Sequence, residues 1–118
     1  MNLGQKQEVF SRSLSRMLTK AEELGYGIRL RELQRTKEQA EIYAAQGKGI
    51  INSNHRNSLA IDLYITVNGE LLWDGEPYQR LATFWKGLSR NGAEHCWGGN
   101  IPRYRDVYHF SIKHNGVI

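Results

Sequence analysis

The stretch "LAIDLYITV", residues 59–67, decides the fold because it alternates strictly between two sets of side chains. Alternation with a period of two predicts a β-strand, with one face in a hydrophobic core and Asp62 on the other. A carboxylate on a sheet face has to be solvated, paired or bound to a metal, because burying it alone is costly. The face that carries Asp62 is therefore the first place to look for a functional site.

The segments on either side of this strand predict helices at the start and a mostly antiparallel sheet after them. Asn68-Gly69 is a strong signal for a two-residue hairpin that pairs residues 59–67 with residues 70–74. The fold class expected from this order is α+β, with about three helices. The helices are expected from Phe10 to Leu24, from Thr36 to Gly47 and from Pro77 to Asn91; the other strands are expected at 27–33, 93–97 and 106–112.

The length and composition fit a single globular domain spanning residues 1–118. One cysteine, Cys96, excludes an internal disulfide. The start of the sequence lacks a signal peptide and no apolar run is long enough to span a membrane, so we expect synthesis in the cytoplasm and no membrane span. A net charge of +4 and a pI of about 9.4 suit an anionic partner, or describe a mildly basic solvated surface. No helix carries a basic stripe and no nucleic-acid motif is present, so nucleic acid is not an expected partner.

Two histidines are expected near Asp62. His55 lies just before the strand, where a bend would bring it over the same face, and His109 points away from the core row of the last strand. Two imidazoles and one carboxylate form a known catalytic zinc set that leaves a fourth position for water. Asp106 is the candidate base for that water. On spacing alone the alternative stays open: a loop histidine, a surface aspartate and a polar residue satisfied within the sheet.

Other candidate ligands and aromatic residues have simpler interpretations. His95 and Cys96 are adjacent on a strand and point to opposite faces, so a shared metal ion is not expected. The three tryptophans are expected in the core, and Trp97, beside Gly98-Gly99, is the best candidate among them for contact with a substrate.

Four motifs in order carry a resemblance to a known family. Ser53, His55, Ala60 and Asp62 fit the pattern Ser-x-His-x-x-Gly-x-Ala-x-Asp, and residues 106–109 fit Asp-x-x-His. Trp97-Gly98-Gly99 stands just upstream, and "LQRTKEQAEIYAAQG", residues 33–47, resembles the family segment that precedes the first histidine. Over roughly residues 28–113 the chain resembles the zinc peptidases grouped with D-alanyl-D-alanine carboxypeptidases and dipeptidases. It is most similar to phage endolysins that act as L-alanyl-D-glutamate peptidases.

The resemblance implies a hedgehog/D-Ala-D-Ala peptidase-like fold and roles for particular residues. It implies Zn²⁺ held by His55, Asp62 and His109, with Asp106 as general base; the aspartate favours the endolysin branch over the carboxypeptidase branch, which usually has Glu. It also implies that Arg35 steadies the substrate carbonyl and that Ser53 supports the metal site. The sequence departs from the family at Ser58, where the family has glycine, and at Tyr108, where it often has proline. If position 58 needs a positive φ, serine strains the loop.

The function expected from the resemblance is zinc-dependent hydrolysis of a peptide bond in a peptidoglycan stem peptide, with the L-alanyl-D-glutamate bond favoured over D-Ala-D-Ala. We expect a monomeric lysis enzyme of phage or prophage type, which reaches the cell wall after another protein permeabilises the membrane. The alternative, motivated by Ser58, is a non-catalytic zinc-stabilised module that binds the cell wall.

Overall fold

The computed structural model describes residues 1–32, 54–101 and 105–118. The helix expected at 36–47 and the residues Arg35 and Ser53 lie outside these described residues. The elements in chain order are α1 (Leu3–Glu23), β1 (Tyr26–Glu32), β2 (Ala60–Val67), β3 (Glu70–Leu72), α3 (Glu76–Gly87), β4 (His95–Trp97), the short 3₁₀ helix η1 (Gly98–Asn100) and β5 (His109–Ile112).

The strands form one antiparallel sheet in the order β1-β2-β5-β4, and β3 pairs with the far end of β2. The expected α+β class with a mostly antiparallel sheet is confirmed. β2 is the central element, because it pairs with three other strands. The two residues of the β2–β3 turn, Asn68 and Gly69, have φ values of 53° and 78°, as a tight two-residue hairpin requires.

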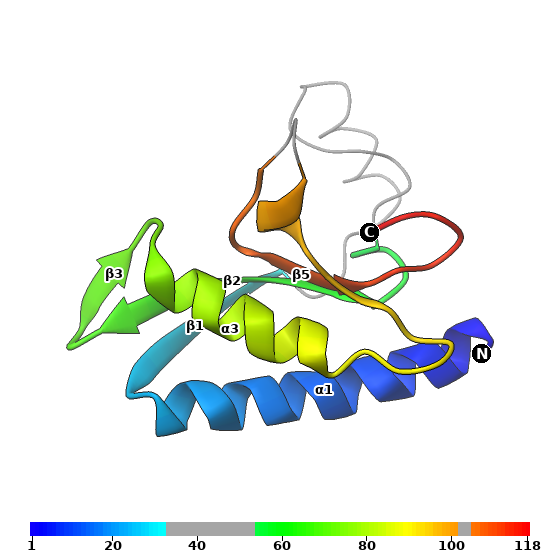
Figure 1. The fold of residues 1–118 in the computed structure, drawn as a ribbon, viewed down its shortest axis with the longest axis horizontal. Coiled ribbons are helices and arrows are strands. Elements are labelled where there is room, and N and C mark those ends of the chain that lie inside the picture. Colours follow the sequence, from blue (N-terminus) through cyan, green and yellow to red (C-terminus); the bar gives the residue numbers. More distant parts are fainter. Residues whose placement is uncertain (33–53, 102–104) are drawn as a thin grey trace.

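The helices α1 and α3 cover one face of the sheet, which becomes the core face (Figure 1). Ile61, Leu63 and Ile65 of β2 are completely buried against this layer, together with Phe110 of β5. Asp62 and Tyr64 alternate with them and are partly exposed on the opposite face. We call this second face the site face, because it carries the candidate ligands.

The starts of α1 and β5 differ most from those expected. α1 starts earlier, because Asn2 and Gln5 cap it reciprocally through their side chains and main-chain N–H groups. β5 starts at His109 rather than at Asp106, because the carbonyl of Asp106 accepts the His109 N–H at 3.2 Å and its carboxylate accepts the Tyr108 N–H at 3.1 Å. Residues 106–108 therefore form a turn that leads into the strand.

The three tryptophans differ in burial, although all of them were expected in the core. Trp85 and Trp97 are buried, with exposed fractions of 0% and 6%, but Trp73 is 64% exposed. Trp73 directly follows β3, a three-residue strand that pairs with the end of β2 next to the hairpin. The prediction that all three tryptophans lie in the core is wrong for Trp73.

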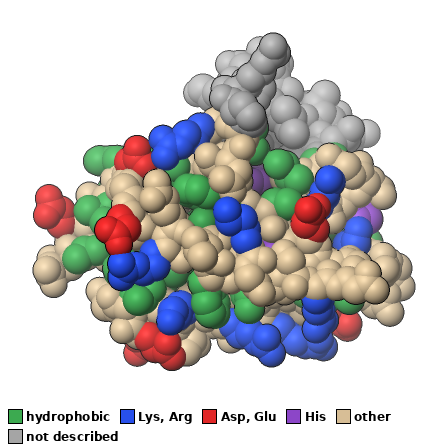
Figure 2. Space-filling model, viewed as in Figure 1, with side chains coloured by type: hydrophobic (Ala, Val, Ile, Leu, Met, Phe, Trp, Pro, Cys, Tyr) green, Lys and Arg blue, Asp and Glu red, His purple; other side chains and the backbone are tan. Residues whose placement is uncertain are grey.

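Basic side chains are unevenly distributed in the view of Figure 2, and they gather over one helix although no basic stripe was expected from the sequence. Figure 2 shows Lys and Arg side chains gathered over α1, where Arg12 and Arg16 are exposed one turn apart. Acidic side chains are interspersed elsewhere on this view. In the part of the chain that the structure describes, no helix combines the length and apolar character needed to cross a membrane.

Candidate metal site

A turn over residues 54–58 positions His55, and Asn54 anchors that turn. The Asn54 side chain is completely buried and donates to the carbonyl oxygens of Ile112 at 2.9 Å and Val117 at 2.6 Å. Its main-chain carbonyl accepts the N–H groups of Asn57 and Leu59. The turn is thus fixed to the C-terminal part of the chain, and the next residue, His55, is held 97% buried beside β2.

The other two candidate ligands face each other across adjacent strands. Asp62 of β2 and His109 of β5 are direct partners in the antiparallel register. Their side chains therefore leave the sheet on the same face at neighbouring positions. The fold brings together residues that are 47 positions apart in the sequence, and the turn adds His55 to them.

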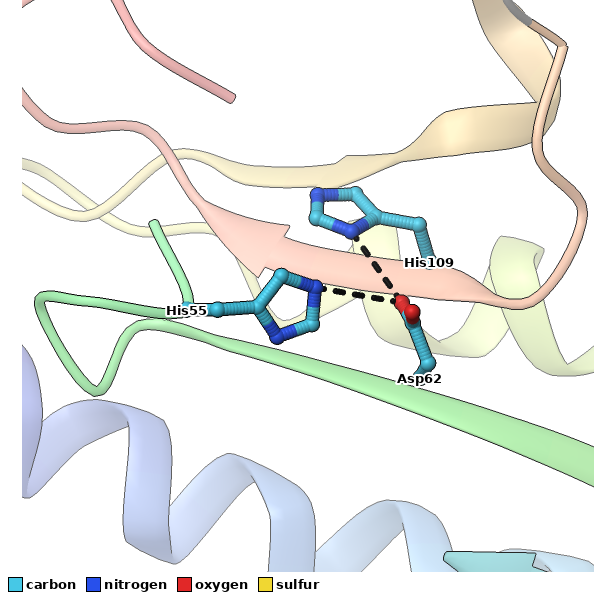
Figure 3. A group of neighbouring side chains, drawn as sticks. All are labelled: His55, Asp62 and His109. Atoms are coloured by element: carbon cyan, nitrogen blue, oxygen red, sulfur yellow. Dashed lines mark hydrogen bonds and ion pairs between the residues drawn. The ribbon is translucent and has the colours of Figure 1, made fainter. Parts of the chain in front are cut away.

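The three side chains point at one another (Figure 3). The Nε2 atom of His55 and the Nδ1 atom of His109 each lie 3.3 Å from the same carboxylate oxygen of Asp62, and all three ligand atoms lie within 4.8 Å of one another. Two ligands held about 2.1 Å from a tetrahedral zinc ion would be about 3.4 Å apart. The spacing and the chemistry of this donor set fit zinc, so these side chains could hold the ion that the sequence predicts.

Electrostatics keep Asp62 charged. Burial raises the pKa of Asp62, but hydrogen bonds from His109 and His55 and the charges of these two imidazoles outweigh it and hold the pKa well below its ordinary value. A carboxylate that stays ionised is a metal ligand across the physiological pH range.

The carboxylate of Asp106 lies beside this group, and its pKa is shifted in the opposite direction to that of Asp62. Its pKa is raised above the ordinary value, first because it is buried and second because the negative charge of Asp62 is near. The hydrogen bond from the Tyr108 N–H and the charges of His109 and His55 reduce that rise. Two nearby carboxylates thus differ in proton affinity, a pattern that often separates a ligand from a base.

Gly98 holds the Asp106 turn close to η1, a role that was not expected from the sequence. The carbonyl of Gly98 accepts the Asp106 N–H at 3.0 Å. A Cβ atom at position 98 would overlap the carbonyl oxygen of Asp106 and lie 2.8 Å from the Cβ of His109. Any residue larger than glycine would displace Asp106 and His109 together.

Ser58 adopts the strained backbone that the sequence comparison with the family anticipated. Its φ is 55°, in the left-handed region, and its N–H bonds to the carbonyl of His55 at 3.3 Å. Serine holds this left-handed conformation at an energetic cost.

Replacing Ser58 by glycine should therefore stabilise the protein. We expect Ser58→Gly to raise the free energy of unfolding by about 1 kcal/mol, because relief of the left-handed strain outweighs the added freedom of the unfolded chain. Thermal unfolding followed by circular dichroism measures this. Ser15→Gly, at an exposed position of α1 where φ is not positive, is the matched control and should lower the melting temperature, because glycine is unfavourable inside a helix. An unchanged or lowered melting temperature for Ser58→Gly would show that the turn carries no such strain.

The remaining candidates fall in two groups. Arg35 and Ser53 lie outside the described residues, so their roles stay predictions. Trp97 is buried, and its indole N–H donates to the carbonyl of Val107 at 2.8 Å, next to the Asp106 turn. This contact ties β4 to the turn, and direct contact of Trp97 with a substrate stays a prediction. Asn54 and Gly98 were missed, because their roles depend on partners that are distant in the sequence.

Comparisons with known proteins agree with the fold. No protein-family model and no curated protein sequence matches the chain. Among solved structures, the L-Ala D-Glu endopeptidase ChiX of Serratia marcescens matches with a TM-score of 0.70 and 19% sequence identity, over 93% of this chain and 85% of that chain. The chain has the fold of that peptidase. The match spans most of both chains, so the two proteins share the fold as a whole.

Proposed function

We propose that the protein is a zinc-dependent peptidase that cleaves the L-alanyl-D-glutamate bond of peptidoglycan stem peptides. The observation that carries the proposal is the convergence of His55, Asp62 and His109 on one point of the site face. The structural similarity to an L-Ala D-Glu endopeptidase supports the choice of bond.

The chain's own residues supply positioning and proton transfer. His55, Asp62 and His109 come from separate parts of the chain. Together they would hold the ion from three directions and leave one side open to substrate. A bound zinc ion polarises a carbonyl and makes water a stronger acid. Asp106 would accept the proton of the attacking water and pass it to the nitrogen of the departing D-glutamate. Its raised pKa makes it a stronger base for that transfer than an ordinary aspartate.

Digestion of purified peptidoglycan tests the proposal directly. Zinc-loaded protein should release peptides that begin with D-glutamate and leave muramoyl-L-alanine on the glycan, which mass spectrometry of the products identifies. A metal chelator should stop the release, and added zinc should restore it. Loss of only a terminal D-alanine would identify a carboxypeptidase. Zinc binding without any hydrolysis would favour the non-catalytic wall-binding module.

A further inference from the structure

An aromatic surface continues from the candidate metal site along the site face. Tyr64 lies two residues after Asp62 on β2 and therefore points to the same face. Its ring centroid is 4.9 Å from that of Tyr108 and 5.7 Å from that of Trp73. We call Tyr64, Trp73 and Tyr108 the aromatic platform.

The platform is held in place although its largest member is exposed to solvent. The Tyr108 hydroxyl donates to the main-chain carbonyl of Trp73 at 2.6 Å, which fixes the backbone there. The guanidinium of Arg31 lies 4.9 Å from the centre of the Tyr64 ring. Trp73 is nevertheless 64% exposed, the highest exposed fraction among the large hydrophobic residues that the structure describes. A rigidly supported indole left in water is typical of a binding surface.

The distance from the metal site to the platform limits which part of a substrate can reach it. Residues two apart on a strand are separated by about 7 Å, so Tyr64 lies about that far from Asp62. In peptidoglycan, an alanyl and a lactyl unit separate the sugar from the carbonyl of the L-alanyl-D-glutamate bond, a spacer of about 7 Å when extended. For a D-Ala-D-Ala bond the same sugar would be about 10 Å further away.

We propose that the aromatic platform binds the N-acetylmuramoyl sugar, so that the protein favours stem peptides still attached to glycan over free peptides. The inference rests on the proposed cleavage of the L-alanyl-D-glutamate bond. The C–H groups on one face of the sugar ring would stack on the electron-rich face of Trp73. Arg31, exposed beside Tyr64, offers N–H donors to the acetamido and hydroxyl oxygens of the sugar.

A pair of substrates with the same scissile bond tests the inference. N-acetylmuramoyl-L-alanyl-D-glutamate carries the sugar, whereas N-acetyl-L-alanyl-D-glutamate lacks it and keeps the acylated alanine nitrogen. The wild type should have the lower KM for the muramoyl compound. Trp73→Ala should raise that KM about three- to tenfold with kcat little changed, and should leave both constants for the acetyl compound unchanged. Trp73→Phe should restore most of the difference.

Leu30→Ala is the matched control. Leu30 is 47% exposed, but it pairs with Leu63 and so belongs to the core-face row of β1. Its replacement should leave KM and kcat for both substrates unchanged. The melting temperatures of all variants show whether they fold.

A binding measurement separates this inference from the proposed function. Saturation-transfer NMR with methyl N-acetylmuramate on the zinc-loaded protein should detect contact of the sugar ring in the wild type and not in Trp73→Ala. Equal KM values for the two substrates in the wild type would overturn the inference and leave the proposed hydrolysis standing. If neither substrate is cleaved but the sugar still binds in a Trp73-dependent way, the proposed function is wrong and sugar binding by the aromatic platform is supported. Absence of both cleavage and sugar binding overturns both.

Discussion

Asp106→Asn is expected to lower kcat on peptidoglycan fragments by about 10²- to 10⁴-fold while leaving zinc affinity nearly unchanged. Asparagine has the shape of aspartate and can still accept the Tyr108 N–H, so the turn into β5 is kept. It cannot accept a proton from water at neutral pH, so only the base is lost. Steady-state kinetics on the variant, together with a zinc titration, measure the two effects separately.

The pH profile and a control variant complete this test. Because burial and the charge of Asp62 raise the pKa of Asp106, the base is protonated at higher pH than an ordinary aspartate. Activity of the wild type should therefore fall as the pH decreases through that raised pKa, and the residual activity of Asp106→Asn should lack this limb. Glu94→Gln, an exposed carboxylate paired with Lys113 at 3.6 Å, should behave like the wild type. Full activity of Asp106→Asn would assign the proton transfer to another group.

Asp62→Asn is expected to weaken zinc binding by more than about 100-fold and to abolish hydrolysis. The carboxylate oxygen is the atom that both imidazoles approach at 3.3 Å, and the amide that replaces it is neutral and a poor ligand for zinc. Replacing groups that only orient zinc ligands already costs about 10- to 100-fold in affinity, so losing a ligand should cost more. Competition with a coloured zinc chelator measures the dissociation constant.

Thermal unfolding gives a second readout that does not depend on activity. Zinc at 1,000 times its dissociation constant should stabilise the wild type by about 4 kcal/mol, because the ion binds only the folded chain. The same zinc concentration should stabilise Asp62→Asn by less than about 1.4 kcal/mol, because a more than 100-fold weaker affinity leaves the ion at less than about ten times the variant's dissociation constant. Asp74→Asn, an exposed aspartate 3.5 Å from Arg105, serves as the control and should respond as the wild type does. An unimpaired response of Asp62→Asn would mean that the ion binds elsewhere.

The sequence was most informative where one local rule determines the structure. Strict alternation over residues 59–67 predicted β2 and both of its faces, since a strand has only two. Asn68-Gly69 predicted the hairpin because both residues tolerate a positive φ. The glycine expected at position 58 from the resemblance raised the possibility of a positive φ there, and Ser58 has a φ of 55°.

Features that depend on partners distant in the sequence could not be predicted from it. Periodicity cannot show that Asn54 is buried against two carbonyl groups near the end of the chain. It also cannot show that Gly98 lies against the Asp106 turn, or that Trp73, in a strand-like segment, is exposed to solvent. For the candidate site, residue type and face were predictable, but the meeting of His55 and His109 at Asp62 required the register of β2 with β5.

The long separation between the paired segments of β2 and β5 also constrains how the protein is made. Ala60 pairs with Ser111 and Asp62 with His109, so the middle of the sheet forms only when both segments are available. During translation at about 5–20 residues per second, the nascent polypeptide has β2 outside the ribosome for several seconds before β5 emerges. The three candidate ligands are therefore all outside the exit tunnel only once His109 has emerged, so under the proposed function zinc can be bound by all three only after that point.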